Sequence, residues 1–190
     1  MSTVEEVALA IAAGQPVVIP TDTVYGLACR PDDEDAVRAL WTLKRRSPDQ
    51  PIALVASGAA PLLELVPELP ADRLVRGAFT LVFPNPARRL LWLGGSDTIG
   101  VRIPAVEGVA AELLERVGVV AATSANLHGG EDPRTVEDVP AAIVDGVGAI
   151  LDVGELPGTP STVVDLRGPE PRVLREGAVP AGEALRRVGE

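Results

Sequence analysis

The chain has 190 residues, of which 46% are apolar and 23% are charged. This content is enough for one sizeable core and excludes a disordered chain, and the length predicts a single domain over residues 1–190. The net charge of −10, from 27 acidic and 17 basic residues, excludes broad binding of nucleic acid by a basic surface. A small basic pocket remains compatible with it.

Three features bear on the cellular compartment. The single cysteine, Cys29, is expected to be a buried thiol, and one cysteine excludes an intramolecular disulfide. The N-terminal residues 1–14 contain Glu5 and Glu6 and no basic region, which does not resemble a signal peptide. No apolar run approaches the ~20 residues that cross a bilayer. We expect a soluble, cytoplasmic protein without a membrane contact.

The predicted elements interleave helices and strands along the chain. Residues 3–13 are expected to form an amphipathic helix, with a capping box of Thr3 and Glu6 and a stop at Gly14. Further helices are predicted over residues 33–43, 59–66, 70–75, 106–116, 135–144 and 180–188. Strands are predicted over residues 17–19, 52–56, 79–83, 98–103, 119–122, 149–152, 162–165 and 172–175. Several strands follow one another directly, so an α/β fold with a mixed sheet is favoured over a regular βαβ series.

The helical spacing also predicts which side chains face the core. In the helix over 33–43 the inward residues are Ala36, Val37, Leu40 and Trp41. In the helix over 106–116 they are Val109, Leu113 and Leu114.

The first segment with chemical potential is Pro20–Leu27, which follows a predicted buried strand. Thr21 and Thr23 each offer a hydroxyl donor and acceptor, and Asp22 could accept from an ammonium group. Polar groups at a strand end are well placed to line a ligand crevice. The same residues would also make an ordinary turn with local hydrogen bonds, and the segment alone does not decide between the two.

Cations occur in two informative places. Lys44, Arg45 and Arg46 end a predicted helix, where they either complement the helix dipole or form a clamp for polyphosphate. Arg102 lies inside an apolar strand and needs a carboxylate partner there, from either the protein or a ligand.

Polar residues also lie at the ends of three later predicted strands, with Ser161 at the start of one of them. The segment at 122–126 would let backbone approach a ligand closely, and Ser161 and Arg175 add a hydroxyl and a cation. The only histidine, His128, is expected to be a solvated loop residue rather than a base. With one His and one Cys there is no usual zinc site, no metal-ligand set is predicted, and no phosphate-binding or nucleophile-elbow motif is present. Such a site suits positioning and charge stabilisation rather than covalent catalysis.

Together these segments resemble the YrdC-like family of threonylcarbamoyl-AMP synthases. The resemblance is carried by PTDTVYGL at 20–27, KRR at 44–46 followed by Gln50 and Pro51, VRIP at 101–104, TSAN at 123–126, STVVD at 161–165 and LREG at 174–177. Six segments in the family's order cover nearly the whole chain. The resemblance implies a twisted open mixed sheet with flanking helices and a large, concave, positively charged cavity.

The implied reaction joins L-threonine, bicarbonate and ATP, with Mg²⁺ accompanying the ATP, and releases pyrophosphate. The product would pass to the tRNA threonylcarbamoyl-transferase complex, and a weak contact with tRNA itself is left open. The resemblance places Thr23, Arg102, Ala122 and Ser161 around threonine. It places Lys44, Arg46, Gln50, Thr98, Ser124, Asn126, Asp132 and Arg175 around the nucleotide, with Lys44 and Arg46 as the catalytic cations.

The chain departs from the family pattern at Arg76–Ala78, where the family often has Pro-Gly-Pro, and at His128, which replaces a small residue. It corresponds to the short, single-domain type. The alternatives are an RNA-binding module of the same fold without synthase activity, a module of a hydrogenase-maturation enzyme, and a nucleotide-binding protein that has lost its activity. The RNA-binding alternative predicts strongly salt-dependent affinity for RNA without ATP turnover.

Overall fold

A computed structural model describes residues 1–48, 50–95 and 97–189. The strands within these residues are β1 (Val17–Ile19), β2 (Gly26–Cys29), β3 (Ala53–Ala56), β4 (Phe79–Pro84), β5 (Thr98–Arg102), β6 (Val119–Ser124), β7 (Ala149–Ile150), β8 (Thr162–Asp165) and β9 (Arg172–Arg175). The α-helices are α1 (Val4–Ala12), α2 (Glu34–Lys44), α3 (Ala59–Leu65), α4 (Gly108–Val117), α5 (Ala141–Val144) and α6 (Ala181–Gly189). Three short 3₁₀ turns are η1 (Ala71–Arg73), η2 (Leu91–Leu93) and η3 (Val136–Asp138).

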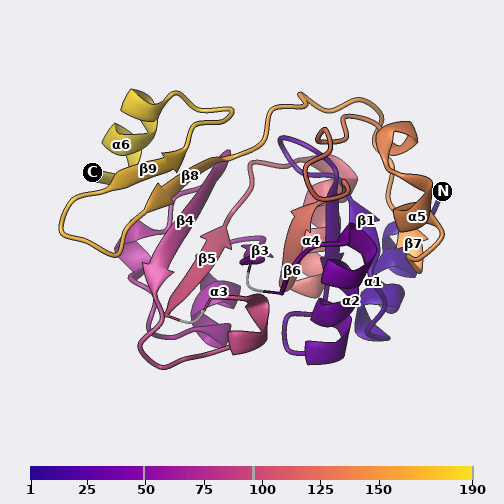
Figure 1. The fold of residues 1–190 in the computed structure, drawn as a ribbon, viewed down its shortest axis with the longest axis horizontal. Helices are drawn as coiled ribbons and strands as arrows, with labels where there is room; N and C mark the ends of the chain where they lie inside the picture. The colour runs from indigo at the N-terminus through magenta and orange to yellow at the C-terminus, as the bar shows by residue number, and fades with distance from the viewer. Residues whose placement is uncertain (49, 96, 190) are drawn as a thin grey trace.

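The strands form one sheet in the order β7-β1-β2-β6-β3-β5-β4-β8-β9. The pairs β1–β7, β3–β5 and β4–β8 are parallel, and the other neighbouring strands are antiparallel. The predicted α/β class with a mixed sheet is therefore confirmed. In Figure 1, β4, β5, β8, β9 and α6 lie on the side of the C-terminus, and β1, β7, α1 and α5 lie on the side of the N-terminus.

Strand β2 is the element that the sequence pattern did not predict. All four of its residues are buried, and it pairs with β1 in the register Val17↔Ala28. The chain thus leaves β1, makes a tight polar turn over residues 20–25 and returns at once. Cys29 ends this strand with no exposed surface, which confirms the expected buried thiol, and burial raises its pKa to about 12.

Helices α1 and α2 each begin with a side-chain cap. In α1 the Thr3 hydroxyl accepts from Glu6 N–H while the Glu6 carboxylate accepts from Thr3 N–H, which is the predicted capping box. In α2 the Asp33 carboxylate accepts from Ala36 N–H at 3.0 Å. The four residues predicted to face inward from α2 are all buried.

The prediction for α4 was wrong in one position. Val109 is 42% exposed, and the buried face consists of Ala110, Leu113 and Leu114. Leu113 and Leu114 share a core cluster with Val7 and Ile11 of α1.

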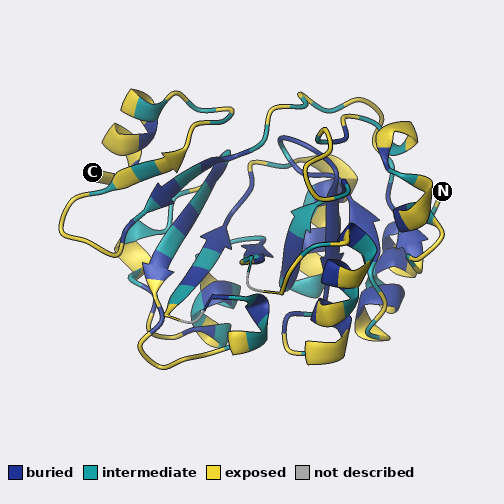
Figure 2. Cartoon of the chain, in the orientation of Figure 1, coloured by how far each residue is buried: buried dark blue, intermediate teal, exposed yellow. Residues whose placement is uncertain are grey.

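Alternation along the strands gives the sheet two unlike faces. On the first face, large apolar side chains such as Phe79, Leu81, Ile99 and Val101 join the core cluster that also receives the buried residues of α2, α3 and α6. In the central strands, Figure 2 shows buried residues alternating with partly exposed ones. Part of the second face is covered by α1 and α4.

Over β5, β4 and β8 the second face carries smaller or polar side chains. Thr80 and Val82 on β4, Gly100 on β5 and Val163 on β8 alternate with the core residues of those strands. This part of the sheet is therefore available for a ligand.

A long connection from β7 to β8 joins the two sides of the sheet, and we call residues 151–161 the strap. In Figure 1 it passes over the top of the molecule as the orange segment. The Tyr25 hydroxyl donates to Asp152 Oδ1 and Gly154 O, both at 2.8 Å, and Gly158 N–H donates to Thr23 O at 2.8 Å. The strap is thus fixed to the polar turn that follows β1. Among the described residues, no helix has the length and apolar character to cross a membrane.

Candidate functional site

The candidate site is a cavity of about 470 Å³ on the second face of the sheet. Its floor is made by β3, β4, β5, β6 and β8, and its walls come from the turn after β1, the end of α2 and the strap. Eight residues predicted for the site line it: Arg46, Thr98, Arg102, Ala122, Ser124, Asp132, Ser161 and Arg175. Segments spread over 130 residues of sequence thus meet in one place.

The other four predicted residues lie behind this wall and hold its members. They are Thr23, Lys44, Gln50 and Asn126, and each makes a hydrogen bond with a lining residue. The predicted roles of all twelve residues as ligand contacts stay predictions.

Arg102 is the most buried of the arginines that line the cavity, with 8% of its surface exposed. Its Nη2 donates to the Asp22 carboxylate and, at 2.9 Å, to the Thr23 hydroxyl. Asp22 also accepts from Ala105 N–H at 2.9 Å, so the polar turn after β1 supplies the carboxylate that a buried arginine requires. Burial lowers the pKa of Arg102 and the neighbouring Asp22 opposes that shift, so the guanidinium stays charged.

One atom of Arg102 is left without a partner. Among the described residues, the Arg102 Nε is the one buried side-chain nitrogen or oxygen atom that makes no hydrogen bond. Because an orphaned donor on a buried cation is costly, an anionic group in the cavity would be stabilised next to it.

Four hydroxyls near the cavity form two hydrogen-bonded pairs. Thr21 and Thr23 share a hydrogen bond of 3.0 Å between their hydroxyl oxygens, and Ser161 shares one of 2.8 Å with Thr80. Arg175 donates from Nη2 to Ser161 O at 2.8 Å, which places a second guanidinium at the same wall.

Lys44 has a different position from the one its sequence context suggested. The side chain is buried, and its ammonium donates to Ser124 O (2.5 Å), Asn126 O (2.7 Å) and Asn126 Oδ1 (2.7 Å). An ammonium has three N–H groups, so these bonds use all of them. Burial and the nearby Arg46 lower the pKa of Lys44 to about 8, and Asp132 opposes this shift.

Arg46 lies at the cavity wall in front of Lys44. It donates from Nε to Gln50 Oε1 at 2.6 Å, from Nη1 to the Thr123 hydroxyl at 3.1 Å and from Nη2 to Pro51 O at 3.2 Å. These bonds fix the guanidinium against the ends of β6 and β3. They also give Gln50 a positioning role that the sequence did not specify.

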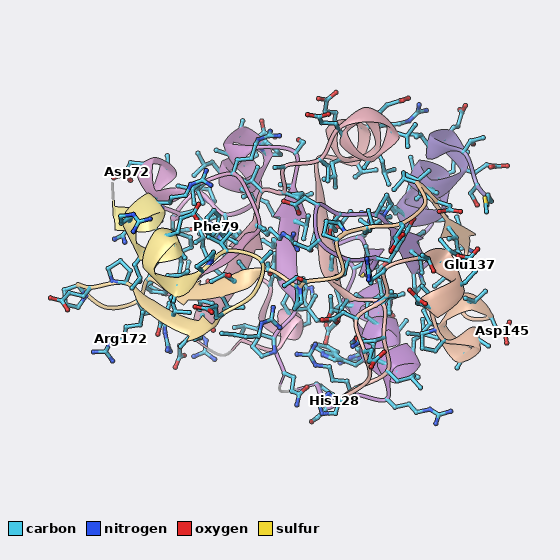
Figure 3. All side chains as sticks on the ribbon, turned by 90° about the horizontal axis from the view of Figure 1, so that it is seen from above. Asp72, Phe79, His128, Glu137, Asp145 and Arg172 are labelled. Atoms are coloured by element: carbon cyan, nitrogen blue, oxygen red, sulfur yellow. The ribbon has the colours of Figure 1, made fainter. Side chains whose placement is uncertain are left out.

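Asn126 and Asp132 close the same wall. Asn126 donates from Nδ2 to Gly130 O (2.7 Å) and to Asp132 Oδ1 (3.2 Å), and its Oδ1 accepts from the Ser124 hydroxyl (2.7 Å). His128 is exposed on this loop and points away from the molecule in Figure 3, which confirms the expectation of a solvated residue.

The structure adds lining residues that sequence reasoning did not name, chiefly Thr80 and Arg167. Thr80 was hidden inside an apolar strand and could be found only by counting alternate positions along β4. Arg167 follows β8 in a short turn, and its two-residue spacing from Asp165 was the available signal.

Four arginines, Arg46, Arg102, Arg167 and Arg175, line the cavity with one carboxylate, Asp132. Such a lining attracts an anionic ligand even though the whole chain carries a charge of −10. A larger hollow of about 670 Å³ lies between α1, α3 and the end of α4, but its lining is mainly apolar and its Arg30 is already paired with Asp32. The 470 Å³ cavity is therefore the one whose side chains can bind an anionic ligand.

The side chains of the described residues were also compared with the ligand sets that hold metal ions. Within the described residues no group of three or more His, Cys, Asp or Glu side chains could hold an ion. The donor set of the cavity, arginines with a single carboxylate, fits a cation that arrives on the phosphates of a nucleotide.

An open mixed sheet with an arginine-lined cavity on one face defines an α/β protein that binds small anionic molecules. The family model described as "Telomere recombination" (Sua5/YciO/YrdC) matches residues 9–177. The chain therefore belongs to the Sua5/YciO/YrdC family, and the sequence-based resemblance is confirmed.

Relatives of known name agree with this assignment. A protein of Vibrio vulnificus named threonylcarbamoyl-AMP synthase is 34% identical over 192 residues, which cover 93% of this chain and 100% of the relative. A Mycobacterium tuberculosis protein that provisionally carries the same name is 41% identical over 179 residues, covering 90% of this chain and 82% of the relative. The structure of Pyrococcus abyssi Sua5 complexed with L-threonine matches with a TM-score of 0.88 and 35% identity, covering 98% of this chain. This chain spans 57% of the length of that structure.

Proposed function

We propose that the chain is a threonylcarbamoyl-AMP synthase, which converts L-threonine, bicarbonate and ATP into threonylcarbamoyl-AMP and pyrophosphate. The observation that carries the proposal is the cavity itself, which combines a buried Arg102 and its hydroxyl neighbours with three further arginines. The names of the relatives and the threonine complex of the Pyrococcus structure support the same reaction.

The threonine end would be the wall formed by Arg102, Thr23, Ala122 and Ser161. The substrate carboxylate would bind the Arg102 guanidinium on the side of its orphaned Nε. The substrate hydroxyl would exchange hydrogen bonds with the hydroxyls around Ser161 and Thr80.

The nucleotide end would be the wall formed by Arg46, Thr98, Ser124 and Arg175. Threonine's amine captures bicarbonate-derived CO₂ as a carbamate, and a carbamate oxygen attacks the α-phosphorus of ATP while the bond to the β-phosphate breaks. Arg46 and Arg175 would neutralise charge as pyrophosphate leaves. Mg²⁺, carried by the ATP phosphates, would add to that neutralisation.

Lys44 would support this wall from behind rather than contact the nucleotide directly. Because its three N–H groups hold Ser124 and Asn126, its contribution would be to fix the loop that faces the nucleotide. A direct contact with phosphate would first require some of these hydrogen bonds to open.

The test is the reaction itself. The purified chain is incubated with ATP, Mg²⁺, bicarbonate and threonine, and pyrophosphate is followed with time. We expect release that requires threonine and bicarbonate together, so omission of either one is the internal control. Pyrophosphate release that is indifferent to threonine would contradict the synthase assignment.

The product would be handed to the tRNA threonylcarbamoyl-transferase complex in the cytoplasm, which makes tRNA modification the purpose of the reaction. The same preparation can be titrated with tRNA at several salt concentrations. The synthase proposal expects weak tRNA binding at most, whereas tight, salt-dependent binding without ATP turnover would favour the RNA-binding module.

A further inference from the structure

Arg167 is a cavity arginine that belongs to none of the segments assigned above. It follows β8, its side chain is 49% exposed, and it lines the cavity together with Ser161 and Val163. Ser161 and Val163 are alternate residues of one face at β8, and Arg167 reaches the same cavity from the turn that follows Asp165.

The register of the sheet places Arg167 at the nucleotide end. Thr98 pairs with Pro84 and Gly100 pairs with Val82, while Val82 pairs with Asp165 across the parallel β4–β8 ladder. The ladder continues beyond Asp165, since Leu166 N–H donates to Val82 O at 2.8 Å. Arg167 follows Leu166 in a turn at this end of the ladder, and it lines the cavity together with Thr98. Arg46 lies across this end of the cavity, at β6 and β3.

The present partner of Arg167 can be exchanged. Arg167 donates from Nε and Nη2 to the two oxygens of Asp165, at 2.8 and 2.7 Å. The Arg167 guanidinium lowers the pKa of Asp165, so the pair is fully ionised at neutral pH. The Arg167 side chain is 49% exposed and that of Asp165 is 12% exposed, so solvent screens the pair from the side of the arginine, and a phosphate group of higher charge can compete for the guanidinium.

Two other cavity arginines are held differently. Arg175 donates to the backbone oxygen of Ser161, and Arg102 is buried beside Asp22 at the threonine end. Arg167 combines a carboxylate partner with exposure and with a position at the nucleotide end. This is what a group that moves onto an arriving polyanion requires.

We propose that Arg167 is a further nucleotide-binding residue, which leaves Asp165 and binds the β- or γ-phosphate of ATP from the side of the cavity opposite Arg46. The proposal rests on the proposed function for the identity of the nucleotide. It goes beyond it by adding a residue outside the segments that carry the family resemblance, and by making Asp165 its internal competitor.

The experiment compares Arg167→Gln with Arg89→Gln. Arg89 is a matched control because it also pairs through Nε and Nη2 with a carboxylate, that of Glu68, and is 41% exposed, but it does not line the cavity. Binding of Mg²⁺–ATP and of AMP to each variant is measured by calorimetry, without threonine, and thermal midpoints confirm folding.

We expect Arg167→Gln to weaken ATP about tenfold, the low end for a charge-assisted hydrogen bond, and AMP less than about twofold. Arg89→Gln should leave both affinities unchanged. Equal ATP affinity in the two variants, or equal losses for ATP and AMP in Arg167→Gln, would overturn the proposal.

Asp165→Asn provides a second variant with the opposite expected sign. Removing the competitor should strengthen ATP binding about two- to threefold, as expected for an ion pair of this exposure. Unchanged or weaker binding would contradict the exchange. ATP binding without threonine-dependent pyrophosphate release would contradict the proposed function alone, whereas a wild-type chain that binds no ATP would overturn both.

Discussion

The ion pair between Arg102 and Asp22 joins two segments that lie 80 residues apart. Replacing each residue separately distinguishes threonine binding by Arg102 from structural support of the cavity wall. Arg102→Ala removes the guanidinium expected to hold the threonine carboxylate. We expect the KM for threonine to rise at least tenfold, because a charge-assisted hydrogen bond is lost, while the affinity for ATP changes less than about threefold. Breaking the buried pair should also lower the free energy of unfolding by about 3–5 kcal/mol.

Asp22→Asn is the control for that prediction. It breaks the same ion pair and should lower the unfolding free energy in urea titrations, but it leaves Arg102 in place. The KM for threonine should then stay within about threefold of the wild-type value. If both variants raise it equally, Arg102 acts only by supporting the wall.

The lowered pKa of Lys44 predicts how the affinity for ATP depends on pH. The folded-state pKa is about 8, below the value of 10.5 expected for an unfolded lysine. As pH rises through 8 the amine loses a proton, so one of the bonds to Ser124 O, Asn126 O or Asn126 Oδ1 loses its donor. ATP affinity should therefore fall with a midpoint near pH 8. Lys44→Met should bind ATP more weakly and lose this midpoint.

The free energy of unfolding should depend on pH in the opposite direction, rising as the affinity for ATP falls. Between pH 8 and 10.5 the unfolded chain binds more protons at Lys44 than the folded chain does. The stability linked to Lys44 is then complete above 10.5 and is lost as pH falls through 8. The difference in unfolding free energy between the wild type and Lys44→Met should thus grow in favour of the wild type over this window. A flat difference would refute the shifted pKa.

Most of the predicted residues line the cavity, but their hydrogen-bond partners could not be predicted. Arg102 in an apolar strand required a carboxylate, and Asp22 lay in another segment already considered polar. Nothing in the spacing could join them, because alternation along a strand gives the face of a residue and not the neighbour across it. Lys44 shows the same limit, since its burial depends on a loop 80 residues away.

At the scale of elements, the strap is bonded to Thr23 of the proposed threonine wall, and Gly158 supplies that bond. Its backbone has φ of +84°, and a Cβ there would overlap the side chain of Arg134. Gly158→Ala should cost about 1–2 kcal/mol from the backbone conformation alone. It should also weaken the bond from Gly158 N–H to Thr23 O and raise the KM for threonine several-fold.

The Gly154→Ala variant separates the effect of backbone strain from that of a steric clash that displaces the strap. Gly154 lies on the same strap with the same φ of +84°, but nothing lies within 4 Å of an added Cβ. It should lose similar stability in thermal unfolding and keep its KM for threonine. Equal KM values in the two alanine variants would show that the strap does not position Thr23.

Elements with a clear period were predicted, and those without one were not. Strand β2 has four buried residues and no alternation, and it follows a polar turn, so neither its type nor its pairing could be inferred. In α4 two apolar faces were available. Packing of Leu113 and Leu114 against α1 selected the face that also buries Ala110 and left Val109 exposed.

At the scale of the whole molecule, charge is divided between the two sides of the sheet. Residues 61–104 and 161–190 contain ten basic and nine acidic residues, a net charge of +1. The remaining residues contain seven basic and eighteen acidic ones, a net charge of −11, which together give the −10 of the chain. In Figure 3, Glu137 and Asp145 lie at the edge remote from Arg172 and α6. The excess acidic charge is thus kept away from the strands that supply Arg102, Arg167 and Arg175.

Because the cavity floor spans strands from both sides of the sheet, ligands that fill it should stabilise the whole molecule. At 100 times its dissociation constant a ligand adds about 2.7 kcal/mol, which for a chain of this size raises the thermal midpoint by about 5–10 °C. We expect this shift with Mg²⁺ and an ATP analogue whose α,β-bridge cannot be cleaved, and a further shift when threonine is added. Sulfate at matched ionic strength controls for general anion effects. Arg102→Ala should keep the shift from the analogue and lose the one from threonine. Failure of threonine to shift the wild-type midpoint would contradict a cavity shared by both substrates.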